Sequence, residues 1–204
     1  HVSALKAAAG APSGYLRSKA AGEAVLREAA NQVDITVLRP SVIFGPGDSF
    51  LNTFATLLKL LPVLPLVGGP ARLQPVYVGD VADVLVASLT DRATFGQTYE
   101  LAGPAVYTLR QLVDYTAKLV GKKRLVIELP DALARLQASV LGLLPKPPLS
   151  PDNLRSLLVD NVSDGAHDYP GWNPQRVEAV APAYLAAIRL RQRLDGYRCR
   201  AGRS

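Results

Sequence analysis

The chain is 204 residues long, 49% hydrophobic and 20% charged, which is enough for one domain with a sizeable core or for a large part of a bigger one. Plentiful aliphatic residues and the lack of low-complexity tracts exclude a disordered or fibrous protein. The formal net charge of +6 does not indicate a nucleic-acid-binding domain, because residues 1–188 carry 17 basic and 16 acidic side chains and the excess lies in an arginine-rich tail at 189–204.

The sequence contains one cysteine, Cys199, so an internal disulfide is excluded and a reducing compartment such as the cytoplasm is indicated. The longest apolar stretches, at 54–67 and 132–144, are too short to span a bilayer. The two histidines have no cluster of further metal ligands beside them in the sequence, so no metal site is predicted. The chain lacks Met and begins with His1, which leads us to expect a segment of a longer protein.

Alternating helix and strand signals predict an α/β protein with a mostly parallel sheet. In chain order, the first predicted elements are a helix from about 13–15 to 30, a strand at 33–38, a turn at 45–48, a helix at 50–61, a strand at 73–78 and a helix at 81–89. They are followed by a strand at 97–102, a helix at 109–120, a strand at 124–129, an amphipathic helix at 131–143, a linker at 146–148 and helices that begin at 151 and 174.

Capping signals set several of these boundaries. Thr108 and Gln111 have the spacing of a capping box, and Gly121 follows the end of that helix. Asp80 precedes an apolar helix, so we interpret it as an N-cap rather than a catalytic group. Asn173 stands before a proline and is interpreted as the cap of the last helix, which is predicted to reach about residue 193.

Tyr15 and Lys19 are the residues most indicative of chemistry, because side chains four apart on a helix share one face. A tyrosine has an ordinary pKa of about 10, and a nearby ammonium favours the phenolate, so we expect Lys19 to lower the pKa of Tyr15. Such a pair can transfer a proton to or from a carbonyl or alcohol oxygen. Lys19 can also bind a ribose hydroxyl and Ser3 can hold the substrate oxygen, while the hydride would belong to a nicotinamide. The spacing alone also fits an exposed helix face with a snorkelling lysine.

Four segments resemble, in the same order, the extended or atypical short-chain dehydrogenase/reductases, which include the NAD-dependent epimerase/dehydratase-like proteins. They are His1–Ala4, Tyr15–Ala20, Leu38–Pro46 and Pro75–Ala82. Gln74–Val78 and Tyr99–Pro104 are most similar to the subgroup that contains the dehydrogenase-like accessory subunit of respiratory complex I and its bacterial homologues. The resemblance covers about residues 2–188.

The resemblance implies roles for individual residues. Tyr15 would be the acid–base tyrosine, Lys19 the lysine that holds the ribose and tunes the tyrosine, and Ser3 the third catalytic member. The loop beside the nicotinamide would consist of Arg39, Pro40, Ser41 and Val42. That place agrees with the rule that ligands bind beyond the carboxyl ends of the strands in open α/β sheets.

The resemblance also implies contacts with the substrate and a cofactor. Arg72 and Gln74 would touch the substrate, with an ordinary surface loop pair as the alternative interpretation. The cofactor implied is NAD(P), with NADP(H) favoured over NAD.

One part of the family pattern is missing, because no GxGxxG occurs and Gly45-Pro46-Gly47 lacks the third glycine. We therefore expect the C-terminal portion of a Rossmann-type doubly wound parallel sheet, without its N-terminal glycine-rich βαβ unit, plus a small C-terminal α/β substrate region. Residues 1–204 would be a single incomplete domain, with 1–90 mainly the Rossmann portion, 91–188 mainly the substrate side and 189–204 a basic tail. Such a segment is expected to bind dinucleotide poorly by itself.

Three functional hypotheses remain open. The first is an NAD(P)-dependent oxidoreductase that acts on a small molecule. The second is a non-catalytic, nucleotide-holding accessory subunit of a respiratory NADH:quinone oxidoreductase, peripheral to the inner membrane, whose helix at 131–143 and basic tail contact a membrane surface or a partner subunit. The third is a sugar-nucleotide epimerase or dehydratase, which would need a nucleotide-sugar pocket around Arg72.

Overall fold

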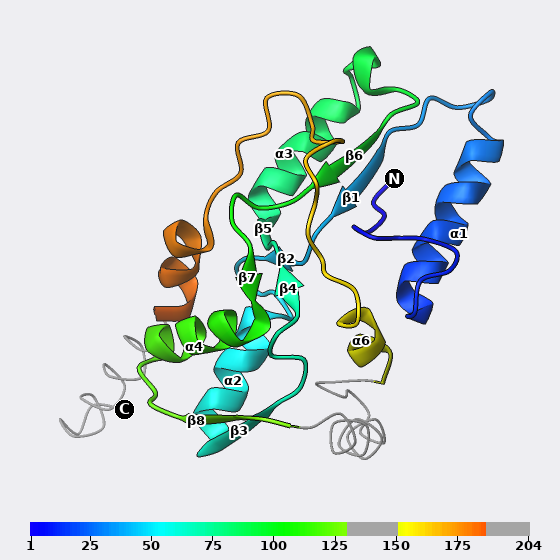
Figure 1. Ribbon diagram of the computed structural model, residues 1–204. Helices are drawn as coiled ribbons and strands as arrows, with labels where there is room; N and C mark the ends of the chain where they lie inside the picture. Colours follow the sequence, from blue (N-terminus) through cyan, green and yellow to red (C-terminus); the bar gives the residue numbers. More distant parts are fainter. Residues whose placement is uncertain (130–150, 187–204) are drawn as a thin grey trace, which may run out of the picture.

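The computed structural model describes residues 1–129 and 151–186 (Figure 1). The described helices are α1 (Gly14–Glu28), α2 (Leu51–Leu60), α3 (Val78–Ser88), α4 (Leu109–Val120), α6 (Pro151–Ser156), a helix at 177–186 and the 3-10 turn η1 (Arg92–Thr94). The described strands are β1 (Val37–Pro40), β2 (Ile43–Phe44), β3 (Val63–Leu66), β4 (Arg72–Leu73), β5 (Val76–Tyr77), β6 (Thr98–Leu101), β7 (Tyr107–Thr108) and β8 (Leu125–Glu128). The predicted helix at 131–143, the linker at 146–148 and the basic tail at 189–204 lie outside the described residues.

Parallel pairing dominates the strands that the structure describes. β1 pairs with β6 in parallel, Val2 bridges to the other side of β1 at Leu38, and β2–β5 and β3–β8 are parallel as well. Only β4–β7, among these described pairs, is antiparallel. The predicted α/β class with a mostly parallel sheet is therefore confirmed.

Two helices cover opposite faces of the β1–β6 pair (Figure 1). Successive side chains of a strand point to opposite faces. Accordingly, Leu38 packs with Val81 and Val84 of α3, whereas the neighbouring Arg39 reaches Glu23 of α1. This arrangement holds the start of α1 near the carboxyl end of β1, where the candidate loop at 40–42 begins.

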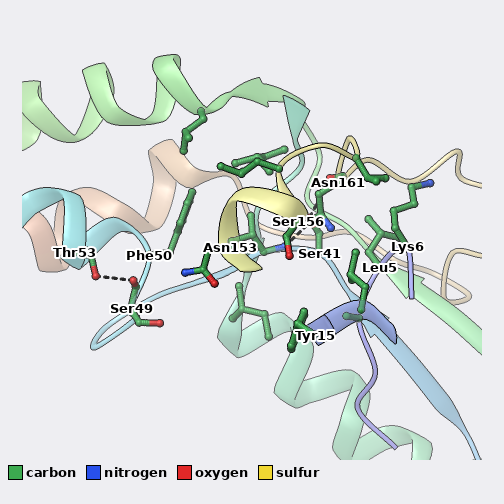
Figure 2. A pocket seen from close by; sticks show the side chains of 18 of the residues that line it. Leu5, Lys6, Tyr15, Ser41, Ser49, Phe50, Thr53, Asn153, Ser156 and Asn161 are labelled. Atoms are coloured by element: carbon green, nitrogen blue, oxygen red, sulfur yellow. Dashed lines mark hydrogen bonds between the residues drawn. The ribbon is translucent and has the colours of Figure 1, made fainter. Parts of the chain in front are cut away.

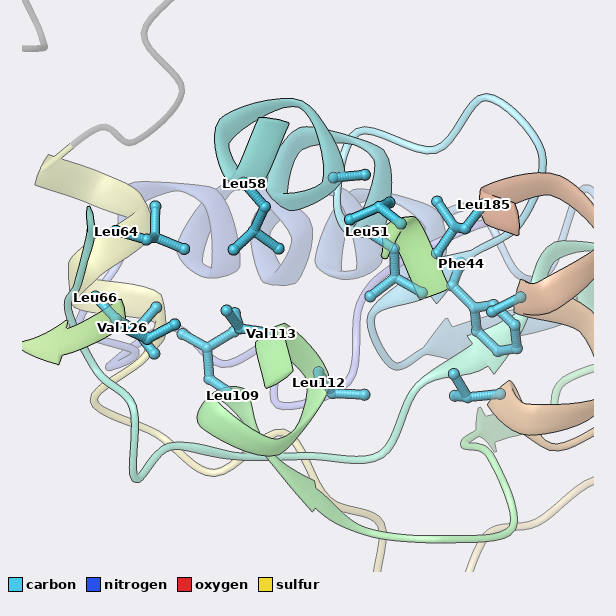
Figure 3. Close-up of a cluster of buried hydrophobic side chains, with 14 of the residues drawn as sticks. Phe44, Leu51, Leu58, Leu64, Leu66, Leu109, Leu112, Val113, Val126 and Leu185 are labelled. Carbon is cyan, nitrogen blue, oxygen red and sulfur yellow. The ribbon is translucent and has the colours of Figure 1, made fainter. Parts of the chain in front are cut away.

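A larger core lies between α2, α4, the β3–β8 pair and the helix at 177–186 (Figure 3). Its most deeply buried side chains include Phe44, Leu51, Leu58, Val113 and Leu185, each with no exposed surface. Within residues 1–129 and 151–186, no helix has both the length and the apolar character needed to cross a bilayer.

Most predicted elements are confirmed. The capping box of α4 is formed in full, and Gly121 ends that helix in the left-handed region with φ of 67°. α1 begins where Ser13 accepts a hydrogen bond from the Leu16 amide, and α6 begins at 151 as expected. The short strands β2, β3 and β7 were not predicted, because two to four residues carry too little periodicity.

Four boundaries were predicted wrongly. The strand expected at 33–38 occupies 37–40, and the strand expected at 73–78 is two short strands separated by Gln74-Pro75. α3 starts at Val78, so Asp80 lies in its first turn and accepts hydrogen bonds from Gln175 instead of capping the helix. The last helix begins at 177, three residues after the predicted proline start.

Candidate functional site

A cavity of about 750 Å³ opens between α1, the chain after β1, α2, β3 and α6 (Figure 2). Six of the predicted site residues line its wall. These are Ser3, Tyr15, Lys19, Pro40, Ser41 and Val42. Its volume lies within the roughly 300–1,000 Å³ of small-molecule sites.

Tyr15 lies in the first turn of α1, with half of its side chain exposed (51%). Its hydroxyl has no hydrogen-bond partner among residues 1–129 and 151–186. Lys19, one helical turn later, donates from Nζ to the Val2 carbonyl at 3.1 Å and lies 5.9 Å from the centre of the Tyr15 ring. The predicted pair is thus brought together, with the ammonium over the ring.

The expected lowering of the Tyr15 pKa does not occur in this structure. Partial burial raises the pKa of Tyr15 above its ordinary value of 10.0. Desolvation causes this rise, and the Lys19 ammonium, which donates to the Val2 carbonyl, does not offset it. The side chain of Tyr15 therefore stays a neutral phenol at neutral pH.

Ser3 and Arg39 meet at Glu23, a carboxylate on α1 that is only 1% exposed. The Ser3 hydroxyl donates to Glu23 Oε1 at 2.5 Å, and Arg39 binds the two carboxylate oxygens through Nε at 2.8 Å and Nη2 at 2.6 Å. Burial alone would raise the pKa of Glu23, but the hydrogen bonds and charges of these partners lower it below its ordinary value. Arg39 is outside the cavity wall, and its role in this structure is to hold α1 on β1.

The loop at 40–42 is held by Asn161, which sequence reasoning missed. The Asn161 side-chain oxygen accepts hydrogen bonds from the Ser41 hydroxyl and, at 3.0 Å, from the Val42 amide. The Asn161 backbone N–H in turn donates to the Arg72 carbonyl at 2.8 Å. A single asparagine in an irregular segment gives no periodic or motif signal, so its role could not be found from the sequence.

The structure does not bring Arg72 and Gln74 to the cavity wall. The Arg72 guanidinium is 3.7 Å from Asp160 in an exposed ion pair. Gln74 donates to the Gly103 carbonyl at 2.6 Å and accepts from the Ser163 amide at 3.0 Å, so its amide joins two loops. Both residues therefore have partners within the protein.

The segment after residue 150 contributes a further group that was not predicted. Asp152 of α6 accepts hydrogen bonds from the Gly14 and Tyr15 amides, at 2.7 Å and 2.9 Å. These hydrogen bonds lower the pKa of Asp152 below its ordinary value. The start of α1 and one wall of the cavity are therefore joined by a charged acceptor.

Comparison of the chain with known proteins identifies several relatives. Residues 3–67, which include Tyr15, Lys19 and the loop at 40–42, match an NAD-binding family described as male sterility protein. The chain is 36% identical over 202 residues to NADH dehydrogenase [ubiquinone] 1 alpha subcomplex subunit 9, mitochondrial, of Arabidopsis thaliana, which covers 92% of this chain and 50% of the relative. The mouse protein of the same name is 34% identical over 201 residues, covering 97% of this chain and 52% of the relative.

The chain spans about half the length of these curated relatives. Among solved structures, the NADPH complex of the Escherichia coli NADPH-dependent quinone oxidoreductase QOR2 aligns with a TM-score of 0.70 at 20% identity. The alignment covers 90% of this chain and 64% of that protein, and it shows a shared fold. These findings support the resemblance of the chain to the extended or atypical short-chain dehydrogenase/reductases.

Proposed function

We propose that the protein is an NAD(P)-dependent carbonyl reductase in which Tyr15 is the proton donor. The observation that carries this proposal is the Tyr15 hydroxyl, which lies in the cavity wall without a protein partner among the described residues. Lys19 stands one turn away, and Pro40–Val42 line the same cavity. An unpartnered hydroxyl within reach of a bound carbonyl is the geometry that general acid catalysis requires.

The donors of the site fit the nicotinamide–ribose half of the cofactor. Lys19 has three N–H donors, one of which is used on the Val2 carbonyl, so it can offer another to a ribose hydroxyl. Pro40, Ser41 and Val42 provide a short, fixed wall for the ring, because Asn161 holds the last two residues. The adenosine and pyrophosphate would need a glycine-rich turn, and the 204 residues contain no GxGxxG.

The protonated state of Tyr15 favours carbonyl reduction over alcohol oxidation. When bound, the reduced nicotinamide supplies a hydride, and with it two electrons, to the carbonyl carbon and is itself oxidised. Tyr15 donates the proton that turns the carbonyl oxygen into a hydroxyl, and its phenolate regains a proton from solvent. A raised pKa keeps Tyr15 protonated before each turnover, as a general acid must be.

The test is Tyr15→Phe in the protein expressed from its complete gene. We expect carbonyl reduction with NADPH or NADH to fall by a factor of about 100 or more, because general acid catalysis contributes about 10²–10⁴-fold. Nucleotide binding should stay close to the wild-type value. Tyr99→Phe, which lies outside the cavity, is the matched control and should retain activity. Full activity in Tyr15→Phe would rule out the proposed role.

Lys19→Ala tests the cofactor site separately. This variant removes the ammonium expected at the ribose, so NAD(P)H should bind at least tenfold more weakly. Parallel titrations with NADPH and NADH test the proposed preference for NADP(H). Unchanged binding of both nucleotides would remove Lys19 from the cofactor site.

A second candidate function is supported by the identity of the curated relatives. Because the chain is 36% and 34% identical to subunits of NADH dehydrogenase, it is a candidate accessory subunit of a respiratory NADH:quinone oxidoreductase that holds nucleotide without turnover. In that case the tagged protein should co-migrate with the respiratory complex on native gels and sit at the membrane periphery. It should bind NAD(P)H, and Tyr15→Phe should leave both respiratory activity and assembly unchanged.

A further inference from the structure

The cavity has two chemically different ends. The end at Tyr15 is lined by the polar residues Lys6, Lys19, Ser41 and Asn161. The other end continues between α2, β3 and α6 as an apolar groove. Figure 2 places Phe50 and Thr53 on the α2 side, across the cavity from Tyr15 and Lys6.

Apolar side chains form most of the groove wall, and Thr53 of α2 and Asn153 and Ser156 of α6 are the polar residues that line the cavity from these two helices. The described lining residues from Phe54 through Leu109 are all apolar. They include Leu57, Leu61, Leu64, Leu66 and Leu73. Leu64 and Leu66 are 2% and 3% exposed, so they form a closed floor, while Phe54 and Leu57 are half-buried at the side.

Such a wall selects against sugars and phosphates. A hydroxyl-rich or charged ligand placed there would lose its water without gaining hydrogen bonds, which is strongly unfavourable. Arg72, the cation that a nucleotide-sugar pocket would need, lies outside the cavity and pairs with Asp160. Aliphatic carbon is the ligand chemistry that this part of the cavity can bury favourably.

We infer that the substrate is an aliphatic chain that carries its carbonyl or alcohol carbon at one end. The oxygen lies at Tyr15 and the chain runs along the apolar groove towards Leu61. This assignment rests on the proposed function, since it uses Tyr15 to fix the end that reacts. The assignment adds a substrate class to the proposed function. The carbonyl that the protein reduces to an alcohol would belong to a long-chain aldehyde or ketone.

The experiment measures the binding of straight-chain 1-alkanols, from hexanol to tetradecanol, to the protein expressed from its complete gene. Each methylene buried should tighten binding about fourfold, since its transfer from water is worth about 0.8 kcal/mol. The gain should stop at the chain length that reaches the end of the groove. Calorimetric titration without nucleotide gives the series, so the result does not depend on turnover.

Leu57→Trp tests the path of the chain. A bulky ring at this half-buried groove position should move the plateau to shorter alkanols and weaken dodecanol binding tenfold or more, while hexanol binding stays unchanged. Leu60→Trp is the matched control on the same helix, because Leu60 is 73% exposed and outside the cavity wall. Phe54→Ala, which enlarges the groove, should extend the plateau to longer chains and serves if Leu57→Trp does not fold.

Two results would overturn the inference. One is the lack of any increase in affinity with chain length, as expected if a segment of the protein itself fills the groove. The other is a plateau that neither Leu57→Trp nor Phe54→Ala moves. Failure of the proposed function looks different, because it would show as unchanged carbonyl reduction in Tyr15→Phe while the alkanol series keeps its dependence on chain length.

Discussion

The carboxylate of Asp152 accepts a hydrogen bond from the backbone amide of Tyr15 at 2.9 Å, across 137 residues of sequence. It also accepts from the Gly14 amide, so two of the N–H groups left unpaired at the start of α1 are bound by one negative charge. Negative charge at a helix N-terminus is stabilising. The turn that carries the proposed proton donor is therefore held in place by the α6 wall of the same cavity.

Asp152→Ala should lower the free energy of unfolding by about 1 kcal/mol, because it removes an acceptor that binds the first N–H groups of α1 as an N-cap side chain does. The measurement is urea denaturation, with Asp152→Asn as a variant that keeps an acceptor without the charge and should lose less. Arg155→Ala is the control. It removes the exposed ion pair that Arg155 forms with Asp152 at 3.9 Å but leaves the Asp152 carboxylate on the α1 amides, so its stability should be close to wild type. Equal stability of Asp152→Ala and wild type would show that α1 does not depend on α6.

The lowered pKa of Glu23 leads us to expect that the protein loses stability in acid. Because the folded-state pKa of Glu23 is lower than its ordinary value of 4.5, its contribution is complete above that value and is lost as the pH falls through the folded-state pKa. Glu23→Gln leaves Arg39 without its partner and should reduce the free energy of unfolding at pH 7 by about 3 kcal/mol. It should also make the stability curve flatter below pH 4.5.

The control for this prediction is Glu28→Gln on the same helix. Glu28 is exposed, so its substitution should leave both the stability at pH 7 and its acid dependence unchanged. Denaturant titrations between pH 3 and 7 compare the three proteins. If Glu23→Gln kept the acid dependence of wild type, another carboxylate would be responsible for it.

Local signals allowed much of the framework to be predicted from the sequence. The capping box at Thr108 and Gln111, the helix start at about 13–15 and the Tyr15–Lys19 spacing are contained within one or two helical turns, so neighbouring residues alone define them. The alternation of elements was likewise enough for the fold class. These features are confirmed because no distant part of the chain competes with them.

The site itself was harder to predict because its supports are distant in sequence. Arg39 was expected beside the nicotinamide, but the strand pleat turns it towards Glu23 on α1. Asn161 holds the loop at 40–42, and Asp152 holds the start of α1, each from more than 100 residues away, and neither belongs to a motif. The direction of the Tyr15 pKa shift depends on burial and on where the Lys19 ammonium lies, and sequence spacing defines neither.

We expect that position 103 tolerates only glycine. A Cβ atom at Gly103 would lie 1.8 Å from the Pro75 carbonyl oxygen, while its own amide donates to the Gln74 carbonyl at 3.1 Å. Gly103→Ala must push these two segments apart, and we expect a loss of about 3 kcal/mol in the free energy of unfolding. Gly10→Ala, with no atom within 4 Å of the new Cβ, is the control and should change stability by less than about 0.5 kcal/mol. Thermal and urea unfolding compare the two, and equal effects would refute the close approach.

The raised pKa of Tyr15 predicts the pH dependence of carbonyl reduction. If Tyr15 donates the proton, only its protonated form is active, and that form persists up to at least its ordinary pKa of 10.0. The value of kcat/KM for reduction should therefore be constant through the neutral range and fall tenfold per pH unit only above about pH 10. Intrinsic fluorescence over the same range checks that the protein stays folded, and Tyr99→Phe should retain the wild-type profile. A decline centred near pH 7 would mean that the Lys19 ammonium lowers the pKa of Tyr15 during catalysis, so that the phenolate, acting as a base for alcohol oxidation, is the resting form.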